Sequence, residues 1–177
     1  MKNLKKLSTV LIALLFFLSC TADADQQNNT TVDGEIQLSG EDTTSVGTTL
    51  KVGAIAYGRK DLTGIEASIV IAPFGSTISE GSPTLAPTDP AYVRSIINFK
   101  DDKNAFVIVV TQELISMVIV TNGVERRYVC DSKFNTSVTC GSITLDAQNK
   151  TLIFNNSTVK NTDTDTILTL NGTLNWN

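Results

Sequence analysis

The sequence predicts an all-β protein, an antiparallel β-sandwich with a β-barrel as the alternative, and two observations carry this prediction. Threonine, valine and isoleucine are abundant, whereas the helix formers Glu, Gln, Arg and Met are sparse. From residue 34 onward, short strand-like runs recur with turn-forming residues between them. The 177 residues suffice for one domain of modest size. We therefore expect a single β domain over residues 34–177.

The last strand of this domain has the clearest pattern. Leu168, Leu170, Leu174 and Trp176 alternate with polar residues, which predicts one core face and one wet face. Gly172 falls on the core side, where it leaves room for a large neighbour or marks a β-bulge. Helix content is expected to be small, with at most a turn at 112–114. The expected strands are residues 35–38, 49–57, 66–72, 92–99, 105–111, 115–121, 124–131, 137–145, 151–156 and 166–176.

Two hairpins can be assigned a register from the sequence. Asn122-Gly123 indicates a type I′ turn, because both positions require a positive φ. The resulting pairs are Thr121 with Val124, Ile119 with Arg126, Met117 with Tyr128 and Ile115 with Cys130. The opposite face of the hairpin is mixed in polarity and carries Val118, Val120, Glu125, Arg127 and Val129. A four-residue loop at 147–150 joins the second hairpin. It sets Asp146 against Thr151, Leu145 against Leu152 and Ile143 against Phe154.

The stretch 75–90 contains three prolines and two glycines and has no periodicity, so we expect a long loop. Long loops in compact domains often carry function, which makes this loop a candidate binding surface. The alternative is a plain connection.

The N-terminus is typical of an export signal. Lys2, Lys5 and Lys6 precede an apolar run over 10–18, which is too short to span a bilayer. Ser19 and Cys20 follow it directly. The segment 15–20 resembles the lipobox of bacterial lipoproteins, although Phe17 stands where leucine is preferred. The resemblance implies a signal peptide over 1–19 and acylation of Cys20 with palmitate-type chains, and ordinary signal cleavage nearby is the alternative.

Residues 20–33 predict a lipidated cysteine followed by a flexible tether, because almost nothing in 21–33 is apolar. Together with the C-terminal pattern over 140–176, the signal and tether resemble the small lipoproteins of Bacteroidota, of the flavobacterial type. The resemblance implies a lipid-anchored β domain in the bacterial cell envelope. Thr21, rather than an aspartate, after the cysteine favours the outer membrane, on its periplasmic or surface face.

Cys130 and Cys140 are expected to form a disulfide, since an exported chain folds in an oxidising compartment. A loop of about ten residues closed in this way stabilises by about 2–3 kcal/mol. The alternatives are free thiols and a catalytic or metal-binding pair, but the spacing matches no zinc or redox motif.

The chain contains few residue patterns that are typical of catalytic sites. With no histidine, Ser-His-Asp and Cys-His catalysis and His-ligated zinc are excluded. Most acidic residues fall in turns, where carboxylates make local hydrogen bonds. The run 161–165 offers oxygen atoms at alternate positions but lacks the glycine and distal glutamate of an EF-hand, so a polar hairpin loop is preferred. We expect no catalytic residue, no metal site and no cofactor.

The charge of the chain bears on its partners. The net charge is −4, and removal of 1–19, with three lysines and no acid, makes it −7. Without a basic run, nucleic acid is excluded as a partner. We expect a membrane-tethered, non-catalytic binding or structural module that meets an envelope or surface protein or glycan. The alternative is a carrier for a small ligand or carbohydrate, which needs an apolar lumen or an aromatic platform such as exposed Tyr57 and Tyr92 side by side.

Overall fold

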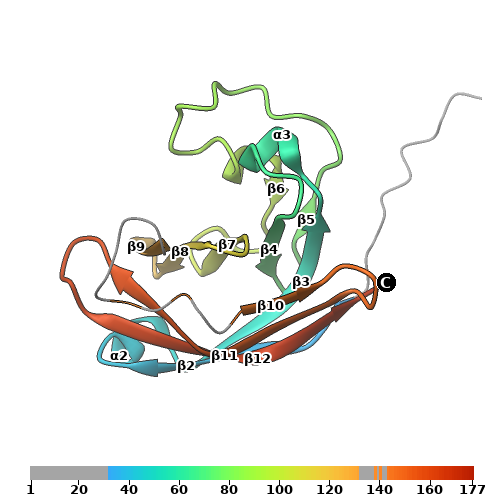
Figure 1. The fold of residues 1–177 in the computed structure, drawn as a ribbon. Helices are drawn as coiled ribbons and strands as arrows, with labels where there is room; N and C mark the ends of the chain where they lie inside the picture. The colour runs from blue at the N-terminus through green and yellow to red at the C-terminus, as the bar shows by residue number, and fades with distance from the viewer. Residues whose placement is uncertain (1–31, 132–137, 139, 141–142) are drawn as a thin grey trace, which may run out of the picture.

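The computed structural model describes residues 32–131, 138, 140 and 143–177, and it shows a closed antiparallel barrel of eight strands (Figure 1). The all-β prediction is confirmed, and of the two expected architectures the chain adopts the barrel. The barrel strands, in the order in which they pair, are β2 (Glu35–Gly40), β3 (Thr49–Tyr57), β4 (Ile69–Pro73), β7 (Ala105–Val110), β8 (Leu114–Thr121), β9 (Val124–Asp131), β11 (Thr151–Asn161) and β12 (Ile167–Trp176).

Four shorter strands complete the fold. β1 (Val32–Asp33) pairs with the end of β12, so two residues assigned to the tether belong to the sheet. β10 (Ile143–Asp146) pairs with the first part of β11. β5 (Thr77–Ile78) and β6 (Ile97–Asn98) form a separate two-stranded sheet. The region expected as one strand at 92–99 therefore holds the 3-10 helix η1 (Arg94–Ile96) followed by the short β6.

Both hairpin registers are confirmed. β8 and β9 pair Thr121 with Val124, and each pair predicted from the Asn122-Gly123 turn is present. Asn122 and Gly123 have φ values of 52° and 78°, as a type I′ turn requires. β10 and β11 pair in the predicted register across the loop at 147–150.

The barrel closes because β12 pairs with β11 on one side and with β2 on the other. The strands bend sharply there. The register of β11 shifts between Phe154 and Ser157, where Asn156 has a φ of 53° and donates its N–H to the Asn171 Oδ1 atom at 2.7 Å. Gly172 follows with a φ of 152°, and a Cβ atom in its place would collide with the Glu35 carbonyl oxygen.

The barrel interior is filled mainly by apolar side chains. Side chains from all eight strands pack in one cluster, with Tyr128, Phe154 and Met117 among the largest. Trp176 belongs to this cluster and is 8% exposed, as its alternating pattern predicts. This burial supplies the main stabilising term of the fold, at about 25 cal/mol per Å² of apolar surface.

A second apolar cluster lies outside the barrel. The outer faces of β3, β4 and β7 contribute Ala54, Val70, Ala72 and Val107. They are covered by α3 (Lys60–Thr63) and by the excursion over residues 74–104, which carries β5, β6 and η1. Figure 1 shows this excursion, in green, on the side of β4 and β7 that faces away from β11 and β12.

Gly172→Ala is expected to reduce the free energy of unfolding by about 2–3 kcal/mol, because an L side chain disfavours this φ and its Cβ strikes the β2 backbone. Urea unfolding measures the change. Gly81→Ala is the matched control, since Gly81 has open surroundings apart from the Ser79 hydroxyl at 3.4 Å. Equal losses in the two variants would contradict the assignment of Gly172 to barrel closure.

Candidate functional site

The excursion over 74–104 is fastened to α3 at two points. Arg59 pairs with Asp61 at 2.7 Å and donates hydrogen bonds to the Ser79 and Gly81 carbonyl oxygens at 2.6 and 3.1 Å. The hydrogen bond from Arg59 lowers the pKa of the Asp61 carboxyl. Tyr92 donates its hydroxyl to the Asp61 carbonyl oxygen at 2.8 Å. The excursion is therefore held over the outer face of β3, β4 and β7.

A groove of about 350 Å³ lies between the excursion and the outer face of β7, β8 and β9. One wall comes from residues 89–94 of the excursion. The floor consists of side chains on the outer faces of β7 and β8, of which four are valines: Val107, Val109, Val118 and Val120. The volume lies in the range of small-molecule sites, and apolar surface with a few polar groups is the usual composition of such sites.

Three charged residues form a polar rim on the groove. Glu125 and Arg127 lie on β9, and Arg94 begins η1 on the opposite wall. Arg127 holds Glu125 tightly, through Nη2 at 2.6 Å and Nε at 2.7 Å from Oε1. Arg94 reaches the other oxygen, Oε2, at 3.4 Å, and its guanidinium lies 5.4 Å from the centre of the Phe99 ring. The rim therefore connects the barrel to the excursion across the groove.

The sequence indicated this site in part. The mixed face predicted for β8 and β9 supplies Val118, Val120, Glu125 and Arg127. The loop at 75–90 contributes Asp89 and Pro90 at its end. Arg94 was not identified, because nothing in its neighbourhood in the sequence links it to Glu125, which follows 31 residues later.

A polar cluster occupies the end of the barrel near α2 (Thr43–Val46), which Figure 1 shows opposite the C-terminus. The Asp42 Oδ2 atom accepts three hydrogen bonds of 2.8 Å, from the Tyr128 hydroxyl, the Asn161 amide and the Thr166 hydroxyl. Tyr128 is 1% and Asn161 3% exposed. Val46 of α2 belongs to the interior cluster. The hydrogen bonds therefore hold α2 against the barrel end, a contact that the sequence analysis missed.

The same contacts shift two pKa values. Burial raises the pKa of the Asp42 carboxyl, but the hydrogen bonds from Asn161, Tyr128 and Thr166 and the nearby charge of Arg126 outweigh it, so the pKa is lowered. Burial, the hydrogen bond to Asp42 and its negative charge raise the pKa of the Tyr128 hydroxyl. Asp42 is therefore ionised and Tyr128 protonated at neutral pH.

The run 161–165, considered above as a weak calcium-loop candidate, is the turn between β11 and β12. The Asn161 Oδ1 atom accepts the N–H groups of Asp163 and Thr164 at 2.9 and 3.3 Å, and its amide is committed to Asp42. Two other turn acids act locally as well. Asp101 accepts hydrogen bonds from residues 103 and 104, and Asp146 from residues 148 and 149. These contacts fit turn residues that stabilise their own loops.

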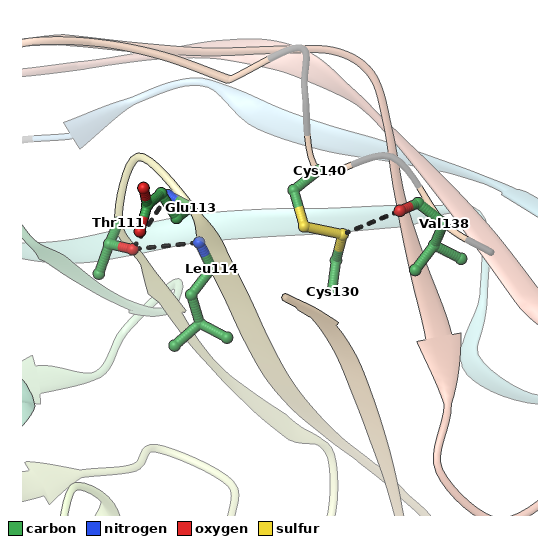
Figure 2. Close-up of a disulfide and its surroundings, with 6 residues drawn as sticks. All are labelled: Thr111, Glu113, Leu114, Cys130, Val138 and Cys140. Atoms are coloured by element: carbon green, nitrogen blue, oxygen red, sulfur yellow. Dashed lines mark hydrogen bonds between the residues drawn. A yellow bond between two sulfur atoms is a disulfide. The ribbon is translucent and has the colours of Figure 1, made fainter. Parts of the chain in front are cut away.

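Cys130 and Cys140 form the predicted disulfide, with Cα atoms 5.5 Å apart (Figure 2). Both residues belong to the buried interior cluster, and the Val138 carbonyl oxygen lies 3.9 Å from the Cys130 Sγ atom. The bond joins the end of β9 to the segment that leads into β10. Cys20, the predicted lipidation site, lies outside the described residues, as do the predicted signal peptide and most of the predicted tether.

Tyr57 and Tyr92 serve different parts of the fold. Tyr57 is 42% exposed and stacks on Trp176, with ring centroids 6.3 Å apart. Tyr92 packs against the outer cluster and is hydrogen-bonded to Asp61. The two tyrosines therefore do not provide the paired platform that a carbohydrate-binding role would favour.

No family model, curated protein sequence or solved structure matches the chain. Among the residues that the structure describes, the helices are too short and too polar to cross a membrane.

Asp42→Asn is expected to lower the free energy of unfolding by about 1–2 kcal/mol at pH 7, because three hydrogen bonds lose their charged acceptor. The folded pKa of Asp42 lies below its ordinary value of 3.8. Its contribution is therefore fully present above that value and is lost as the pH falls through the folded pKa. Urea unfolding at several pH values checks that the difference between wild type and variant shrinks below pH 3.8.

Glu41→Gln provides the control for Asp42→Asn, since Glu41 is the exposed acid next to it. If both variants lost the same stability with the same pH dependence, the hydrogen-bonded contact of Asp42 would have no special weight.

Proposed function

We propose that the protein is an exported, lipid-anchored and non-catalytic binding module of the bacterial cell envelope, and that the groove over β7 and β8 is its binding surface. The groove carries this proposal. It combines an aliphatic floor with a charged rim, and Tyr92 ties its wall to α3, while Arg59 holds an earlier part of the same excursion. A binding site held on rigid elements needs no large rearrangement to accept a partner.

The N-terminal sequence supports the anchored part of the proposal. The basic start, the apolar run, Ser19 and Cys20 make acylation at Cys20 the expected modification. Residues 21–31 separate Cys20 from β1, and a fully extended segment of that length spans at most about 40 Å. Two or three acyl chains on Cys20 are enough for stable attachment to the outer membrane, whereas one chain is marginal.

Cys20→Ala tests the anchor. The wild-type protein is expected in the outer-membrane fraction with the mass of two or three acyl chains on residue 20, because only the thiol accepts the first lipid. The variant is expected in the soluble fraction of the envelope. Fractionation and mass spectrometry of the mature protein provide the measurement. A soluble, unmodified wild-type protein would overturn the lipid-anchored part and leave an exported binding module.

A photoreactive phenylalanine at position 116 tests the groove, because Ser116 is exposed and lines it. Irradiation of intact envelopes is expected to give a defined adduct at this position, read by mass spectrometry. The same residue at position 173, exposed on β12, is the control. Equal labelling at both positions, or none at position 116, would contradict a binding role for the groove.

A further inference from the structure

We propose that the groove binds an unbranched aliphatic chain with a carboxylate head, that is, a free fatty acid. This inference rests on the binding role proposed above and specifies its ligand. It follows from three properties of the groove: an aliphatic floor, the absence of an exposed aromatic surface among its lining residues, and the side chain of Arg94, which makes one long hydrogen bond within the described part of the chain.

The floor is a patch of β-branched side chains arranged by strand register. Val107 on β7 lies opposite Val118 on β8, and Val118 in turn lies opposite Arg127 on β9. One rung away, Val109 pairs with Ser116. The outer face thus changes from apolar to charged within one strand spacing of about 4.8 Å. A ligand that lies along β7 and β8 meets methyl groups below it and charge along one side.

The lining favours an alkyl chain over a sugar or a base. Phe106 is its one aromatic residue, and that side chain belongs to the barrel interior and is 5% exposed. Sugars and nucleobases are usually bound by stacking on exposed aromatic rings, which these lining residues do not supply. Burial of methylene groups against the valines stabilises a bound chain by about 0.8 kcal/mol per group.

Arg94 selects the head group. A guanidinium carries five N–H donors in a planar fork that fits a carboxylate. Among the described residues, Glu125 is the hydrogen-bond partner of Arg94, and at 3.4 Å the contact is long. Glu125 is already held by two nitrogen atoms of Arg127. A carboxylate at Arg94 therefore adds hydrogen bonds without breaking the tight pair on β9.

Asp89 disfavours a carboxylate in its own part of the groove. Its Oδ1 atom accepts the Ala91 N–H at 2.8 Å, which fixes a carboxylate on the excursion wall. This charge repels a second carboxylate. At the rim, two arginines, Arg94 and Arg127, face the single carboxylate of Glu125, which leaves a net positive charge there. The acidic head is therefore expected beside Arg94, with the chain over the valines.

Isothermal titration calorimetry with decanoate tests the inference on the exported chain that carries Cys20→Ala, so that no acyl chain on the protein competes. Decyltrimethylammonium has the same chain with a cationic head, and acetate has the head without the chain. Decanoate is expected to bind at least tenfold more tightly than either.

Variants separate the two parts of the site. Arg94→Ala is expected to weaken decanoate binding about tenfold, the loss of one charge-assisted contact, whereas Lys100→Ala on the same excursion has no effect. Asp89→Asn is expected to tighten decanoate binding about twofold. Val118→Asp, which places a charge in the aliphatic floor, is expected to abolish it. Thermal unfolding of each variant checks that the fold is retained.

Three results would overturn the fatty-acid assignment: equal affinity for decanoate and decyltrimethylammonium, equal effects of Arg94→Ala and Lys100→Ala, or no binding of decanoate. If decanoate failed to bind while the probe at position 116 still gave its adduct, the groove would remain a binding site for a different ligand. If decanoate failed to bind and the probe at position 116 gave no adduct, the proposed function would fail together with the fatty-acid assignment.

Discussion

The pairing of β12 with both β11 and β2 is the constraint on which the rest of the structure depends, because it turns an open meander into a closed barrel. A closed sheet leaves no long unpaired edge at this seam and encloses its inward-facing side chains from all sides. Closure requires β12 and β2 to approach closely while β11 bends. Gly172 permits the approach, and Asn156, held by the Asn171 side chain, absorbs the bend.

The two ends of the barrel are stabilised by different chemistry. At one end, Asp42 brings α2 onto the interior through hydrogen bonds to residues that follow it by 86, 119 and 124 positions. At the other end, β9 and β11 separate, since their pairing is confined to residues 128–129 and 160–161. The disulfide from Cys130 to Cys140 joins the end of β9 to the segment before β10, where backbone pairing between β9 and β11 has stopped.

Local features of the fold could be predicted from the sequence, and distant ones could not. The Asn122-Gly123 turn and the apolar pairs around 147–150 define register over a few residues, and both registers are present. The pairing of β2 with β12 joins segments about 130 residues apart in the sequence, and strand periodicity carries no information on such partners. The same limit applies to the site: Glu125 and Arg127 follow from the hairpin, whereas Arg94 depends on the path of the excursion.

The groove lies where the excursion leaves part of the apolar outer face of the barrel uncovered. The valines and alanines of β3, β4, β7 and β8 form an apolar surface several strands wide, which water disfavours. The excursion covers its β3 and β4 side and is held there by Arg59 and Tyr92, so it cannot also close over β8. Arg94 meets Glu125 across the remaining gap with a long contact. The excursion thus leaves a groove with apolar and charged walls. A ligand with an apolar chain and a charged head completes the burial of this face.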